Sequence, residues 1–263
     1  CMYRIHEQPS LDKIETLRLF MAGLDYKFSK GQVIKPKIFN NLINIVAGSP
    51  HEEVVNTIIL RTQMQAKYSP ENHGHFGLSL TRYAHFTSPI RRYADVLVHR
   101  ALIRALRLGD DGLSQFDTDN FYETAEHIST TERNSMVAER NSTERYIAHY
   151  MSQKIDEEFE GKINGVLNAG LFISLTETGG EGFIPISSIT GDYFHYDKNH
   201  QLIEGEHSGL IFQLGDSVTV RLREANPISG GLIFELIDDR LLKNASSKKT
   251  VKNSRRPRKR KRK

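Results

Sequence analysis

Residues 161–185 read GKINGVLNAGLFISLTETGGEGFIP. Apolar and polar side chains alternate here, and glycines separate the alternating runs, a pattern that predicts half-buried β-strands joined by turns. We expect strands at residues 160–167, 172–176, 182–185, 218–224 and 232–236. Five short strands within about 80 residues predict a small closed barrel.

Upstream of this stretch, the apolar residues recur at helical spacing. Ser10 is a suitable N-cap for a first helix that carries Ile14 and Leu17. We expect further helices at residues 35–47, 51–66, 88–108 and 119–157, and a short strand at 76–80. The expected fold class is α+β, with a mostly helical portion over residues 1–158, the barrel over 159–242 and a tail over 243–263.

The formal net charge of +4 hides a strong asymmetry. Of the 36 Lys and Arg residues, 12 lie in residues 243–263, which contain no Asp or Glu, so 24 basic residues stand against 32 acidic ones in residues 1–242. The body is acidic, and the tail is expected to be disordered because it has no apolar face. This distribution excludes a uniformly basic nucleic-acid-binding protein.

Cysteine usage and hydropathy exclude other classes of protein. Cys1 is the only cysteine, so no internal disulfide and no cysteine-based zinc site can form, and a reducing cytoplasm fits. No apolar run approaches the about 20 residues of a membrane span, and residues 1–6 lack the apolar core of a signal peptide. We expect a cytoplasmic protein without membrane contact, and a fragment of a longer chain, because the first residue is not Met.

Residues 83–95 read YAHFTSPIRRYAD and form a second informative segment. Ser88 and Pro89 predict an N-cap and a first helical residue, which places Arg91 in the first helical turn. The helix dipole favours acids there, so an arginine indicates a shared anion such as phosphate. The aromatic rings that accompany it are suited to stacking on bases: Tyr83, His85, Phe86 and Tyr93.

A structural explanation accounts for these residues equally well. In it, Arg91 or Arg92 pairs with Asp95 one turn later, and the aromatic rings belong to the core. No residue is expected to ligate a metal, because the histidines match no standard zinc spacing. These histidines are His6, His75, His85 and His99.

The order of these residues resembles that of a known family. The peptide His75-Phe76-Gly77-Leu78, residues 83–95 and the pair His99-Arg100 resemble the last sequence block of the catalytic domain in the ribonuclease II/ribonuclease R (RNB) family. Residues 3–6 and 68–72 resemble neighbouring segments of that domain. The resemblance covers residues 1 to about 158 and is strongest to the bacterial ribonuclease R branch, of which this chain resembles the C-terminal part.

The resemblance implies a processive 3′-to-5′ exoribonuclease that degrades RNA to nucleoside 5′-monophosphates by Mg²⁺-assisted hydrolysis. It implies that Arg91 is catalytic and offsets charge on the phosphoryl oxygens. Arg92 and Tyr93 are adjacent RNA-binding candidates. The family's metal-binding aspartates lie upstream, and the acidic residues before position 100 form no comparable cluster. We therefore expect this chain alone to be inactive.

The barrel sequence resembles the S1-type RNA-binding domain, a five-stranded OB-fold barrel that follows the catalytic domain in ribonuclease R. The resemblance implies RNA contacts at Phe172, Phe183 and Lys162. Ala169 and Pro185 stand where this pattern commonly has an aromatic residue and a histidine, so the expected affinity is modest. In the alternative arrangement Phe172 or Phe183 fills the barrel interior, and strand alternation decides between the two.

The tail residues Arg255, Arg256 and Arg258 are expected to attract RNA through counterion release, and a ribosome contact through the tail is a further hypothesis. The expected partners are single-stranded RNA and structured RNA with a 3′ overhang. Two functions remain open: a ribonuclease R-like exoribonuclease fragment, and a non-catalytic S1-type RNA-binding protein. The segment at residues 87–95 favours the first, because a stand-alone binding module has no need of it.

Overall fold

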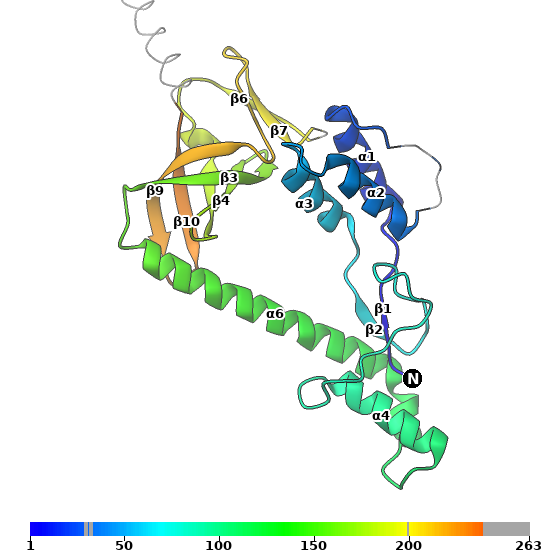
Figure 1. Ribbon diagram of the computed structural model, residues 1–263. Coiled ribbons are helices and arrows are strands. Elements are labelled where there is room, and N and C mark those ends of the chain that lie inside the picture. Colours follow the sequence, from blue (N-terminus) through cyan, green and yellow to red (C-terminus); the bar gives the residue numbers. More distant parts are fainter. Residues whose placement is uncertain (29–30, 32–33, 199, 239–263) are drawn as a thin grey trace, which may run out of the picture. The chain divides into compact units, whose positions relative to one another are not determined.

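The computed structural model describes residues 1–28, 31, 34–198 and 200–238. Residue contacts divide the chain into two units, Cys1–Glu139 and Arg140–Lys263. The long helix α6 (Phe121–Met151) crosses the boundary between them (Figure 1). None of the helices in the described ranges has the length and hydrophobicity that crossing a membrane requires.

The first unit begins with a two-stranded sheet and three helices (Figure 1). β1 (Tyr3–Ile5) pairs antiparallel with β2 (Lys67–Ser69), and between them in the sequence come α1 (Leu11–Gly23), α2 (Pro36–Val46) and α3 (Glu52–Thr62). The Ser10 side chain accepts a hydrogen bond from the Lys13 backbone N–H and caps α1, as expected. Both α1 and α2 contact α3. The buried apolar residues of these helices include Leu17, Phe20, Phe39, Leu42, Val55 and Ile59.

Helix and strand bounds in this unit differ from the expected ones at four places, one of which is the start of the helix expected at residues 88–108. α3 ends at Thr62 and not at residue 66, because Gln63 is extended and leads toward β2. Residues 76–80 form no strand, since His75 and Leu80 exchange backbone hydrogen bonds across a tight turn. The long helix expected at residues 119–157 is α6, which ends at Met151, and an unexpected short helix, α5 (Gln115–Asp119), which a Ser114–Asp117 capping box begins, precedes it.

The helix expected to begin at Pro89, after Ser88 as its N-cap, begins four residues later, as α4 (Tyr93–Leu106). The cause is the fully buried Asp95 carboxylate, which accepts the Ser88 backbone N–H at 2.7 Å and the Arg92 guanidinium at 2.9 and 3.1 Å. The backbone N–H groups of Arg91 and Arg92 both donate to the Ser88 carbonyl oxygen. Residues 88–91 therefore form a turn, and the prediction that Ser88 caps the helix is wrong.

The second unit is a closed barrel, as the alternating sequence predicts. Its strands are β3 (Glu158–Leu167), β4 (Gly170–Leu175), β5 (Glu181–Pro185), β9 (Ser217–Asn226) and β10 (Gly231–Ile237), in the order β10-β5-β4-β3-β9. Each lies within three residues of its expected place. The interior contains Ile163, Leu171, Ile173, Ile184, Val220, Leu222 and Phe234, and the C-terminal turns of α6 add Ala148 and Met151 to the same core.

A second, three-stranded sheet in this unit was not expected from the sequence. It consists of β6 (Phe194–Asp197), β7 (Leu202–Gly205) and β8 (Ile211–Gln213), after a 3₁₀ turn η1 (Ile186–Ser188). The strands have only three or four residues each, too few for alternation to stand out in the sequence. Phe194, Ile203 and Phe212 anchor the sheet in the core of the barrel.

Two leucines of the β3–β4 hairpin test the inward and outward assignment. Leu171 is completely buried, whereas Leu167 is 48% exposed. We expect Leu171→Ala to lower the free energy of unfolding by about 2–5 kcal/mol, because it leaves a cavity. We expect Leu167→Ala to change it by less than about 1 kcal/mol. Urea unfolding followed by circular dichroism measures both, and equal losses would contradict the assignment.

The buried Asp95 carboxylate predicts a pH-dependent contribution to stability. Burial by itself raises the pKa of this carboxyl, but the Ser88 N–H and the Arg92 guanidinium outweigh burial and hold its pKa below the usual value. Its contribution is therefore full above the unfolded pKa of about 3.9 and is lost as the pH falls through the folded pKa.

We expect Asp95→Asn to lower the free energy of unfolding at neutral pH by about 1–3 kcal/mol. The difference from the unmodified chain should shrink when urea unfolding is repeated in acid. The exposed turn residue Asp110 provides the control, because Asp110→Asn removes the same charge without a buried partner. A difference that stays constant down to strongly acidic pH would rule out this role for Asp95.

Candidate functional site

Arg91 lies in the turn before α4, with its side chain exposed. The neighbouring Ile90 is 98% exposed and Tyr93 is 49% exposed. Within the described ranges, the Arg91 side chain has no hydrogen-bond or ion-pair partner, whereas Arg92 is bound to Asp95. The ion pair that the sequence left open is thus formed by Arg92, and the guanidinium of Arg91 is accessible to an anion. Because Arg91 precedes the helix, the argument that placed it in the first helical turn is wrong.

A continuous chain of aromatic rings runs through the same unit. Consecutive ring centroids are 5.1–6.1 Å apart, mostly edge to face, a favourable geometry for aromatic contacts. In order along this chain, the rings are Tyr68, His85, Tyr83, His75, His6, Phe76 and Phe39. Tyr83 and His85 are therefore half-buried and in contact with each other, whereas Tyr93 stands apart on the helix.

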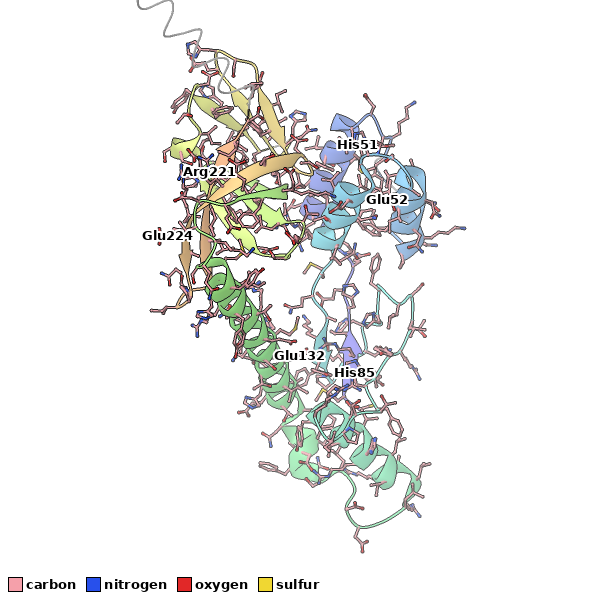
Figure 2. The ribbon with its side chains drawn as sticks, turned by 60° about the vertical axis from the view of Figure 1, so that its left-hand side comes forward. His51, Glu52, His85, Glu132, Arg221 and Glu224 are labelled. Carbon is pink, nitrogen blue, oxygen red and sulfur yellow. The ribbon has the colours of Figure 1, made fainter. Side chains whose placement is uncertain are left out.

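Charged groups surround the end of this ring chain. The Tyr68 hydroxyl lies 2.9 Å from Nδ1 of His85, and the Arg4 guanidinium stacks 4.6 Å above the Tyr68 ring. Arg4 also pairs with Glu132 of α6 at 2.6 Å, and Figure 2 shows Glu132 and His85 in the same region. Burial, then the nearby Arg92 and Arg4, lower the pKa of His85. His85 is therefore neutral at neutral pH and can hydrogen-bond without adding charge.

Three residues of this cluster were missed in the sequence. Arg4 and Tyr68 lie in segments that the family resemblance covered, so the resemblance contained a usable signal for them. Glu132 lies 128 positions from Arg4 in a helix with many charged residues, and nothing in its local sequence distinguishes it. Its role follows only from the tertiary contact.

The carboxylates of Asp95 and Glu132 do not fit a metal centre. Asp95 is committed to Arg92 and Ser88, and Glu132 is committed to Arg4. Across the part of the chain that the structure describes, no group of three or more His, Cys, Asp or Glu side chains is placed to hold an ion. The residues present thus do not fit the Mg²⁺ site that the family resemblance implies.

Phe172 and Phe183 form a pair on the outside of the barrel. They lie opposite each other on β4 and β5, with ring centroids 5.0 Å apart. Phe172 is 40% exposed and Phe183 half-buried, while the alternating residues Leu171 and Ile184 are completely buried. The alternative in which these phenylalanines fill the interior is therefore wrong.

The neighbours of this pair make an open, sparsely covered surface. Gly165 of β3 lies opposite Phe172, and a Cβ atom there would come within 3.3 Å of the Phe172 ring. Lys162 pairs with Ser174 in register and alternates with inward-facing residues, so its side chain lies on the same outer face. The structure thus places Lys162, Phe172 and Phe183 on the same outer face of the barrel. The tail residues Arg255, Arg256 and Arg258 lie outside the described residues.

Comparison with family models assigns both parts of the chain. Residues 1–108 match the RNB domain, and residues 152–236 match the S1 RNA binding domain. The chain is 40% identical over 238 residues to Ribonuclease R of Aquifex aeolicus, and 34% identical over 244 residues to Ribonuclease R of Escherichia coli. Each alignment covers 90% of this chain, which spans 34% and 30% of the length of these relatives.

Solved structures show the same relationship. The apo form of Mycoplasma genitalium RNase R superimposes with a TM-score of 0.80 at 28% identity, over 90% of this chain and 37% of that one. The same protein in complex with ribose methylated single-stranded RNA gives a TM-score of 0.80 at 27% identity, with the same shares covered. With an RNB match followed by an S1 match, and these relatives over nine tenths of its length, the chain belongs to the RNB family represented by ribonuclease R.

Proposed function

We propose that this chain is the RNA-holding part of a 3′-to-5′ exoribonuclease, and that single-stranded RNA lies across the outer face of its barrel. The observation that carries the proposal is the outward Phe172–Phe183 pair, whose ring surfaces are available to bases. Base–aromatic stacking contributes about 1–3 kcal/mol per base. Lys162 on the same face supplies a cation for the phosphate backbone. The RNA complex of the similar Mycoplasma genitalium RNase R supports this assignment.

Arg91 is the residue that we propose for contact with the scissile phosphate. Its guanidinium is exposed, whereas the adjacent Arg92 is occupied by Asp95. A guanidinium binds two phosphate oxygens at once and offsets the charge that develops on them during hydrolysis. Tyr83 and His85 would line the same wall, and Tyr93 offers an exposed ring beside it.

Hydrolysis itself requires groups that the described part of this chain does not supply. We propose that Mg²⁺ is held by residues of the longer enzyme, and that processive release of nucleoside 5′-monophosphates belongs to that whole protein. The alternative, a non-catalytic RNA-binding role for this chain by itself, is favoured by the commitment of Asp95 and Glu132 to arginines.

We also propose a location, further partners and domain bounds for this chain. They are a cytoplasmic location, structured RNA with a 3′ overhang as a partner, a tail that attracts RNA or the ribosome, and domain bounds of 1–158, 159–242 and 243–263. The basic tail sequence supports the attraction to polyanions, because each neutralised phosphate releases counterions.

The aromatic pair predicts a loss of RNA binding on truncation. We expect Phe172→Ala and Phe183→Ala each to weaken binding of a labelled single-stranded oligonucleotide, by about 5- to 150-fold for a loss of 1–3 kcal/mol. Phe116 of α5 is 76% exposed, and Phe116→Ala is the matched control. Fluorescence anisotropy measures the affinities. Unchanged binding by both barrel variants would contradict the proposed face.

The missing metal ligands predict that the chain binds RNA without degrading it. Incubation of the purified 263-residue chain with Mg²⁺ and labelled single-stranded RNA should release no mononucleotides above a protein-free control. The RNA should still shift in a binding assay. Robust release of mononucleotides would show that this part of the enzyme holds a complete metal centre.

A further inference from the structure

A groove beside the aromatic pair is not used by the proposed function. It lies wholly within the second unit, between α6 and the turns that precede β5 and β10, and has a volume of about 220 Å³. Ile147 and Leu232 supply its apolar lining, and Arg140, Glu144 and Glu181 its charged lining. The groove is smaller than the about 300–1,000 Å³ of pockets for drug-sized ligands, so it suits one flat ring.

The groove is a fixed part of the fold. At Gly230 a Cβ atom would lie 2.9 Å from Cβ of Glu144, so α6 and the β9–β10 turn approach as closely as glycine allows. Ile147 packs against the core of the barrel. These contacts hold both walls in place without a ligand.

The groove adjoins the surface that carries Phe172 and Phe183. Glu181 is two residues before Phe183 on β5, so both side chains project from the same outer face. Glu181 also lies opposite Ser174 of β4, and its Oε1 accepts a hydrogen bond from Nδ2 of Asn164 at 3.0 Å. This bond holds one carboxylate oxygen, and Glu181 also lines the groove.

We propose that the groove is a base-selective subsite, in which the Glu181 carboxylate accepts a hydrogen bond from the exocyclic amino group of one RNA base. The proposal rests on RNA binding by the barrel. A carboxylate only accepts hydrogen bonds, so it matches N4–H₂ of cytosine and repels O4 of uracil. Ile147 and Leu232 pack against the ring, and Arg140, whose side chain is 69% exposed and lies 3.5 Å from Glu144, is available to a phosphate.

Two oligomers of equal charge and nearly equal shape test the subsite. Fluorescence anisotropy with labelled hexacytidylate and hexauridylate should show that the unmodified chain binds the cytidine oligomer about five- to tenfold more tightly, which is within the range of one hydrogen bond exposed to solvent. We expect Glu181→Gln to abolish this ratio, because the amide can also donate to uracil O4. Glu177→Gln removes the same charge from the turn that precedes β5 and should preserve the ratio.

A variant that fills the groove provides a second test in the same binding experiment. Thr143 is an exposed groove residue of α6, and Thr143→Trp should abolish the cytidine preference while both oligomers still bind through the aromatic pair. Equal binding of the two oligomers by the unmodified chain, or a preference that survives Glu181→Gln or Thr143→Trp, would overturn the subsite alone. Failure of both oligomers to bind would overturn RNA binding by the barrel as well.

Discussion

The buried carboxylate of Asp95 determines the structure of the segment that carries Arg91. By accepting the Ser88 N–H and the Arg92 guanidinium, it delays the start of α4 to Tyr93 and folds residues 88–91 into a turn. Two adjacent arginines thereby receive different roles. Arg92 neutralises a buried charge, which would be strongly unfavourable without a partner. Arg91, one residue earlier, remains in solvent, where it can meet a phosphate.

Charged groups are also paired along the ring chain of the first unit. Arg4 stacks on Tyr68 and pairs with Glu132, and Tyr68 hydrogen-bonds His85. Burial and the nearby Arg92 and Arg4 lower the pKa of His85, so this imidazole adds no charge to the ring chain at neutral pH. In the proposed function, these rings contact bases and the exposed guanidinium of Arg91 attracts the RNA backbone. Cation and stacking surface are the two elements that single-stranded RNA requires.

In the barrel, strand alternation decides which side chains face outward. Leu171, Ile173 and Ile184 fill the interior, which leaves Phe172 and Phe183 outside and in contact with each other. Gly165 keeps the adjoining strand clear of the Phe172 ring. Glu181, on the same face, leads from this pair to the groove against α6. In the proposed function, this face combines a sequence-tolerant stacking platform with a position that distinguishes bases.

The sequence by itself determined the architecture of the barrel, because alternating apolar and polar residues indicate half-buried strands. It left the side of Phe172 and Phe183 open, and the structure decided it through the burial of Leu171 and Ile184. The sequence also determined the Ser10 cap and the membership of the RNB family, through the order of residues 75–100. Only the tertiary structure decided that Arg92 and not Arg91 pairs with Asp95, and that Arg4 meets Glu132. It alone showed the β6–β8 sheet and the groove. Local sequence patterns specify which face of a helix or strand is buried. The contacts that only the structure showed depend on how the elements of a unit pack against one another.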